Sequence, residues 1–109
     1  MRTWTETRRE GTDCGPVDWT HPMVAKATAR NGIALDVLRA MEADPSAFQV
    51  TTDGGWPRCG WRPVLSVCMY DGWPYWQPGP AVLVAGVIGG GEWYWIDSLT
   101  GVERVREDS

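Results

Sequence analysis

The sequence predicts an α+β fold in which two N-terminal helices pack on a four-stranded, mostly antiparallel sheet. Apolar residues recur at helical spacing only before residue 45. After residue 46, alternating and continuous apolar runs are separated by Gly-rich and Pro-rich turns, as in a meander of strands. The chain has 109 residues, of which 43% are hydrophobic, which is enough for one modest core. We therefore expect a single domain over residues 1–109.

Within this domain the chain divides into three parts. Residues 1–11 are polar and charged and are expected to form an N-terminal arm. Residues 12–45 form the helical half, and residues 46–109 form the β half.

The helical half contains clear start and stop signals. Pro22 suits the first position of a helix, where its missing N–H costs nothing, and this helix is expected to extend to about Arg30. Asn31-Gly32 then provides residues that tolerate the left-handed conformation at a helix end. A second helix is expected from about Ile33, and Asp44-Pro45 ends it.

In the β half, strands are predicted by β-branched and aromatic residues between turn signals. They are expected at Phe48–Thr52, Val64–Tyr70, Ala81–Ile88 and Glu92–Asp97, with a short edge at Val102–Val105. Turns separate them at Gly89–Gly91 and at Ser98–Gly101. Because successive strands are joined by short turns, the sheet is expected to be antiparallel.

Charge and composition exclude several classes of function. The net charge is −4 and Lys26 is the only lysine, so no basic stripe is available for nucleic-acid binding. The longest apolar run, Ala81–Ile88, is too short to cross a membrane. No signal peptide is indicated, and we expect a cytoplasmic location.

The three cysteines, Cys14, Cys59 and Cys68, match no zinc-finger or redox spacing. We therefore expect no metal site and no cofactor. A disulfide requires an oxidising compartment, so free thiols are the expected state.

Three segments resemble papain-like cysteine peptidases, most closely the group that cleaves double-glycine leaders from bacteriocins. Thr12–Pro16, ahead of a helix, is similar to the nucleophile segment of this group. Pro80–Val87 and Trp93–Gly101 are similar to its apolar strand and to the aromatic strand that ends in Asp. The resemblance implies a reduced papain-like core over about residues 13–101.

The same resemblance implies that Cys14 stands at the position of the nucleophile and Asp97 at that of the residue that orients the catalytic imidazole. Pro80 stands where the family has its catalytic histidine, and proline cannot accept a proton. The oxyanion-hole glutamine position falls near Arg8. His21 is the only histidine in the chain. Two hypotheses follow: a non-catalytic derivative of the fold, or a divergent cysteine hydrolase or amidase that uses Cys14 with His21 or with an imidazole from a partner chain.

A loop rich in Trp and Pro favours the non-catalytic hypothesis. Eight Trp occur in the chain, and Trp73, Tyr75 and Trp76 lie in a segment that Pro74 and Pro78 stiffen. Aromatic side chains on a stiff loop offer contact area at low entropic cost. We expect this loop to bind another protein or a peptide, as an inhibitory module of the kind that phages direct against host proteins. A homodimer is also compatible with this composition.

A second fold is compatible with part of the chain. Val67–Gly72 and Gly91–Trp95 can be read as pieces of a small SH3-like barrel with a helical N-terminal extension. Barrels of this kind bind extended or Pro-rich peptides on an aromatic surface.

Overall fold

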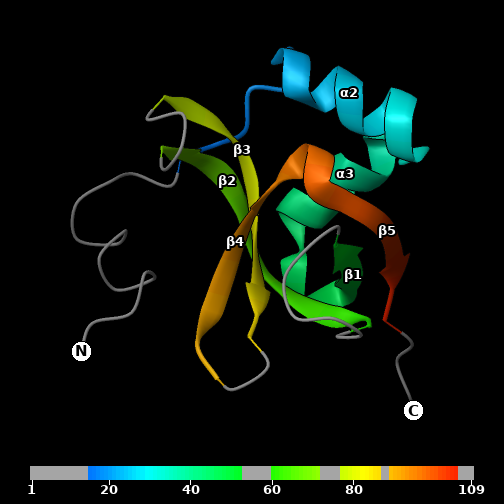
Figure 1. The fold of residues 1–109 in the computed structure, drawn as a ribbon, viewed down its shortest axis with the longest axis vertical. Helices are drawn as coiled ribbons and strands as arrows, with labels where there is room; N and C mark the ends of the chain where they lie inside the picture. The colour runs from blue at the N-terminus through cyan, green and yellow to red at the C-terminus, as the bar shows by residue number, and fades with distance from the viewer. Residues whose placement is uncertain (1–14, 53–59, 72–76, 87–88, 106–109) are drawn as a thin grey trace.

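The computed structural model describes residues 15–52, 60–71, 77–86 and 89–105. Within these ranges the chain forms two α-helices and five strands, which confirms the predicted α+β class (Figure 1). The elements in chain order are α2 (Pro22–Asn31), α3 (Leu35–Ala43), the 3-10 turn η1 (Pro45–Ala47), β1 (Phe48–Thr52), β2 (Arg62–Asp71), β3 (Pro78–Ala85), β4 (Gly91–Trp95), the 3-10 turn η2 (Ile96–Ser98) and β5 (Leu99–Arg104).

The described strands form one antiparallel sheet in the order β4-β3-β2-β1-β5. β2 is the strand that the two halves of this sheet share. Its first residues pair with β1, through Val50 opposite Arg62, whereas Val64 to Asp71 pair with β3. β2 therefore connects a three-stranded half, with β3 and β4, to a smaller half that holds β1 and β5.

The prediction of four strands was wrong, because β5 is a full strand. It pairs with β1 from Phe48 opposite Arg104 to Thr52 opposite Leu99, whereas the sequence predicted a turn followed by a short edge. The direction of the chain changes earlier, in η2, where Ile96 is fully buried. Burial of Ile96 ends β4 at Trp95 and leaves residues 99–104 free to run along β1.

Both helices form as predicted, with one shifted boundary. α2 begins at Pro22 and ends at Gly32, which has a left-handed φ of 70° and donates its N–H to the carbonyl of Thr28. α3 begins at Leu35, two residues after the expected start at Ile33. Ile33 is buried in the connection instead, and Leu35 is exposed.

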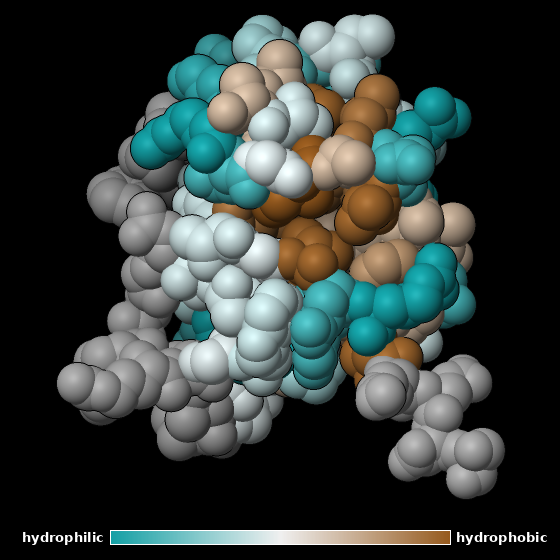
Figure 2. Space-filling model, turned by 90° about the vertical axis from the view of Figure 1, so that its right-hand side faces the viewer, coloured by the Kyte–Doolittle hydropathy of each residue, from teal (hydrophilic) through white to brown (hydrophobic). Residues whose placement is uncertain are grey.

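The main core lies between the two helices and one face of the sheet, as the layers in Figure 1 indicate. Its fully buried residues come from every layer: Ala27, Leu38, Met41, Val50, Val82, Val84, Ile96 and Leu99. The helices thus supply a large part of the core and do not lie outside it. Figure 2 shows apolar surface bordered by polar side chains on the side where α2, α3 and β5 lie in Figure 1.

A buried arginine joins the two halves of the sheet. Arg62, at the start of β2, is 6% exposed. Its guanidinium donates to the Glu92 carboxylate at 2.9 Å and to the Tyr94 hydroxyl at 2.9 Å, both on β4. It also donates to Thr52 on β1 and, at 3.5 Å, to the carbonyl of Ala85 on β3. Four strands therefore meet at one cation.

The protonation states in this cluster follow from the same bonds. Burial disfavours the charged guanidinium, but its hydrogen bonds to Glu92 and Tyr94 outweigh this and raise the pKa of Arg62. The bonds from Arg62 and from the Tyr94 hydroxyl, at 2.7 Å, lower the pKa of the Glu92 carboxyl. Glu92 is therefore held as a carboxylate, the state that the arginine needs.

Replacing Arg62 by alanine is expected to lower the free energy of unfolding by about 2 kcal/mol, because the polar groups around it lose a shared donor. Urea denaturation measures the change. Arg39→Ala is the matched control, since Arg39 is exposed on α3, and its effect is expected to stay within about 0.5 kcal/mol. Equal effects of the two substitutions would contradict the role given to Arg62.

The Glu92 carboxyl predicts a dependence of stability on pH. Its pKa is lowered in the folded state, so its contribution is complete above the unfolded value of about 4.5 and is lost as the pH falls below it. Since the side chain is 38% exposed, solvent screening limits this contribution to about 1 kcal/mol. We expect the stability difference between wild type and Glu92→Gln to shrink between pH 6 and 3. A difference that stays constant with pH would rule this out.

Candidate functional site

The segment that leads into α2 is fixed to two elements. Gly15 forms an isolated antiparallel bridge with Met69 of β2, whose N–H donates to the Gly15 carbonyl at 3.1 Å. From α3, the Glu42 carboxylate accepts the backbone N–H of Val17 at 2.8 Å and the indole N–H of Trp19 at 3.1 Å. The residues before His21 are therefore held against both the sheet and a helix.

His21 caps the N-terminus of α2. Its backbone is extended, with φ −62° and ψ 138°, as expected for the residue before Pro22. Its Nδ1 accepts the backbone N–H of Met23 at 3.1 Å. An Nδ1 that accepts a hydrogen bond carries no proton, so the neutral ring has its proton on Nε2.

This hydrogen bond occupies a nitrogen that a catalytic triad requires. In such a triad one ring nitrogen accepts the proton of the nucleophile and the other donates to a carboxylate, so both nitrogens are used. Here Nδ1 is taken by the Met23 N–H, which leaves only Nε2.

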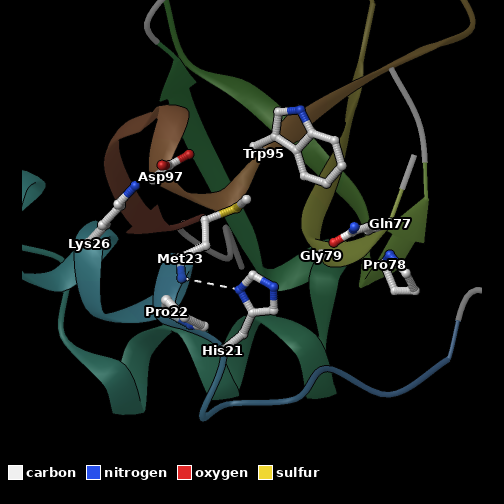
Figure 3. A pocket seen from close by; sticks show the side chains of 9 residues that line it. All are labelled: His21, Pro22, Met23, Lys26, Gln77, Pro78, Gly79, Trp95 and Asp97. Carbon is white, nitrogen blue, oxygen red and sulfur yellow. Dashed lines mark hydrogen bonds between the residues drawn. The ribbon is translucent and has the colours of Figure 1, made fainter. Parts of the chain in front are cut away.

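His21 opens into a pocket of about 230 Å³ between α2 and the ends of β3 and β4. Figure 3 shows the nine residues that line it: His21, Pro22, Met23, Lys26, Gln77, Pro78, Gly79, Trp95 and Asp97. The side chains of Met23, Trp95 and the two prolines form the apolar wall of the pocket. The polar side chains supply hydrogen-bond donors and acceptors: His21, Lys26, Gln77 and Asp97. The pocket can therefore receive a group that is largely apolar and has one or two polar atoms.

The shape of the pocket depends on Gly79. A Cβ at this position would lie 3.0 Å from the Trp95 ring and 3.6 Å from the end of Met23. Since only glycine lacks that atom, the indole can lie against β3. Trp95 is also tilted against Tyr70, with the ring centroids 5.8 Å apart, and Tyr70 stacks on Trp93 at 4.4 Å. The pocket wall is thus the end of a row of aromatic rings.

Asp97 lies in the same pocket as His21 but on its other side. Figure 3 shows the side chain of Met23 between them, and the Lys26 side chain pointing toward the Asp97 carboxylate. Among the contacts of the described residues, no hydrogen bond joins Asp97 to His21. The backbone of Asp97 is held through its carbonyl, which accepts the Asn31 amide at 3.1 Å. His21 and Asp97, two of the candidate catalytic residues, therefore line one pocket without a hydrogen bond between them.

The other residues singled out in the sequence either lie outside the described ranges or are buried in the sheet. Cys14, Trp73, Tyr75 and Trp76 lie outside the described residues. Pro80 is fully buried in β3, opposite Met69.

The expectation of free thiols is wrong for Cys68, which is disulfide-bonded. The prediction followed from the absence of any sign of an oxidising compartment in the sequence, and it took no account of which cysteines the fold brings together.

Sequence reasoning missed Met23, Gln77, Gly79 and Trp95 as pocket residues. A partial signal was present, since Gly79 stands between Pro78 and Pro80, three residues after Trp76.

Within the described part of the chain, no group of three or more His, Cys, Asp or Glu side chains is placed to hold a metal ion. In the same residues, no helix has the length and apolar character needed to span a bilayer.

The His21 cap gives a prediction about stability. His21→Ala removes the acceptor for the Met23 N–H and is expected to lower the free energy of unfolding by about 1 kcal/mol. His21→Ser restores a cap acceptor and is expected to remain within a few tenths of a kcal/mol of wild type. Thermal or urea unfolding distinguishes the two. If serine destabilises as much as alanine, the imidazole has a role other than capping.

A scan of protein-family models, a search of curated proteins and a search of solved structures found no match for this chain.

Proposed function

We propose that this chain is a non-catalytic, reduced papain-like domain that binds another protein or a peptide. The contact surface would comprise the Trp/Pro-rich segment at residues 72–76 and the pocket that the next two residues in the sequence, Gln77 and Pro78, help to line. The observation that carries this proposal is the hydrogen bond from Met23 to His21 Nδ1, which commits the only imidazole of the chain to a structural role.

The position of the pocket supports its use as part of a binding surface. Gln77 and Pro78, which follow the loop directly in the sequence, are exposed and line the pocket. A partner that contacts the loop can therefore place a side chain between Pro78 and Trp95. Aromatic anchors beside a preformed pocket are typical of the centres of protein interfaces.

The charges in and around the pocket restrict the partner. The Lys26 side chain points toward the Asp97 carboxylate, and both lie on the side of the pocket away from His21 (Figure 3). His21 offers an Nε2 donor, and the chain as a whole carries a net charge of −4. An apolar side chain with a hydrogen-bond acceptor, on a neutral or basic partner, fits this arrangement.

The packing of the helices supports a papain-like core over an SH3-like barrel with a helical extension. In the second fold, the strands would enclose a core of their own. Here Val24 and Ala27 of α2 and Leu38 and Met41 of α3 are buried with the strand residues in one cluster. Removing the helices would expose one face of the sheet.

One observation favours the alternative, a divergent cysteine hydrolase. His21 and Asp97 line the same pocket, and the chain before His21 leads back to Cys14. A hydrolase that uses this histidine would have to release the cap, so that both ring nitrogens are available to a thiol and a carboxylate.

Selection from a random peptide display library tests the proposal. We expect wild type to enrich peptides with an apolar or aromatic anchor, and Trp73→Ala or Trp76→Ala to weaken the binding of those peptides about tenfold or more. Gly79→Val, which fills the pocket beside Trp95, is expected to weaken it likewise. Leu65→Ala is the matched control, because Leu65 is exposed near Gly91, at the opposite end of β4 from Trp95, and its effect should stay below about twofold.

Two results would contradict the proposal. One is a selection that enriches no peptide, or only peptides that bind the loop variants as well as wild type. The other is hydrolysis of library peptides that disappears in Cys14→Ser, which would establish the hydrolase instead.

A further inference from the structure

The pocket beside His21 contains a hydrogen-bond donor that no other described residue uses. The neutral His21 ring carries its proton on Nε2, because Nδ1 accepts the Met23 N–H. Within the part of the chain that the structure describes, Nε2–H donates to no protein atom, and Figure 3 shows it on the side of the ring toward Gly79. The ring is half-buried, so this N–H gains from an acceptor that a ligand brings.

The volume of the pocket fits one large side chain. It measures about 230 Å³. A protein cavity of about 150 Å³ holds a benzene molecule, so this pocket can take a six-membered ring together with a few more atoms. The Trp95 indole and the Met23 thioether side chain lie on its wall, and both groups make favourable contacts with aromatic rings. The wall therefore suits a flat ring.

Few natural side chains combine an aromatic ring with a hydrogen-bond acceptor. Phenylalanine has no polar side-chain atom, and the tryptophan N–H is a donor only. Lysine and arginine have donors and no acceptor, so neither can bond to the His21 Nε2–H. Neutral histidine has an acceptor nitrogen but a smaller ring. The tyrosine hydroxyl both accepts and donates, on a ring of the size that the volume admits.

A neutral phenol also suits the charges around the pocket. Lys26 and Asp97 lie together on the side away from His21 (Figure 3), and the chain has a net charge of −4. A carboxylate of the partner would supply an acceptor, but it would add negative charge and leave the aromatic wall unused. A phenol, with an ordinary pKa of about 10, brings no charge at neutral pH.

We propose that the pocket binds a tyrosine side chain of the partner, with the phenol oxygen accepting the His21 Nε2–H. The inference rests on the proposed function, because this tyrosine is the anchor of the protein or peptide that the chain binds. Gln77 also lines the pocket, and its amide oxygen can accept the phenol O–H. Gln77 and Pro78 are exposed, so the partner's backbone can run past them while its side chain lies inside.

Binding of side-chain analogues to the full chain tests this inference without any partner. p-Cresol represents tyrosine, and toluene represents phenylalanine. Each is titrated into ¹⁵N-labelled protein at about pH 8, where imidazoles are neutral, and NMR follows the Gly79 amide and the Trp95 indole signals. We expect both compounds to shift both signals. The Kd of p-cresol is expected to be about three- to tenfold lower than that of toluene, the ratio that one additional hydrogen bond gives.

Two variants serve as a matched pair, each checked for its fold by the NMR spectrum. His21→Ser keeps an acceptor for the Met23 N–H and removes Nε2–H, so the advantage of p-cresol is expected to disappear while toluene binding stays within about twofold. Gly79→Val places a side chain against Trp95 and is expected to abolish the binding of both compounds. If a variant does not fold, the comparison of the two compounds on wild type decides.

Three results with the analogues would overturn the inference: equal binding of p-cresol and toluene, no shift with either, or a preference for p-cresol that persists in His21→Ser. In the peptide selection, anchors of leucine or phenylalanine in place of tyrosine would overturn it and leave the proposed function standing. A preference for p-cresol in a chain that selects no peptide would support recognition of the phenol and contradict the proposed function.

Discussion

The guanidinium of Arg62 is the contact on which the arrangement of the strands depends. It is buried where β2 leaves β1 and begins to pair with β3, and its donors are used by groups on β1, β3 and β4. A buried cation is tolerated only when its hydrogen bonds are satisfied, so the acceptors must stay in place together. β4 contributes two of them, Glu92 and Tyr94, which fixes its position two strands away from Arg62.

The position of β4 in turn sets the geometry of the pocket. With Glu92 and Tyr94 facing Arg62, alternation along the strand turns Trp93 and Trp95 to the other face, where Trp93 stacks on Tyr70. Trp95 is the last residue of β4, and its ring lies over Gly79 because no Cβ stands there. The next residue, Ile96, enters the core and places Asp97 beside α2. A cluster at one end of the sheet thus determines the pocket wall at the other.

Much of the local structure was predictable from the sequence. Pro22, Gly32 and the helical spacing between them act within a few residues, and so do the alternating and apolar runs of β1 to β4. The fifth strand was not predictable in this way. Whether residues 99–101 form a turn or a strand depends on β1, about fifty residues earlier, and on the burial of Ile96. Long-range pairing of this kind leaves no mark in the segment itself.

The candidate site, too, was predictable only where it depends on neighbouring residues and not on contacts between distant ones. Asp97 was named from the resemblance to papain-like peptidases and His21 as the only histidine of the sequence. Both line one pocket, but the sequence could not show which ring nitrogen of His21 is in use. That depends on Met23 and on the extended backbone that Pro22 imposes. The Arg62 cluster was also missed, because it joins residues that are distant in the sequence.

The chemistry of one nitrogen atom connects the fold to the proposed function. In a triad one ring nitrogen of the histidine accepts the proton of the nucleophile and the other donates to a carboxylate, so His21 would need both nitrogens, and the cap of α2 uses one of them. Releasing the cap would cost about 1 kcal/mol, which is a small barrier by itself. The larger obstacle is the absence of a compensating contact, since Asp97 lies beyond Met23 and faces Lys26. With the histidine committed to the helix, the features that remain to the pocket are its shape, its aromatic wall and its few polar groups, and these suit the binding role proposed above.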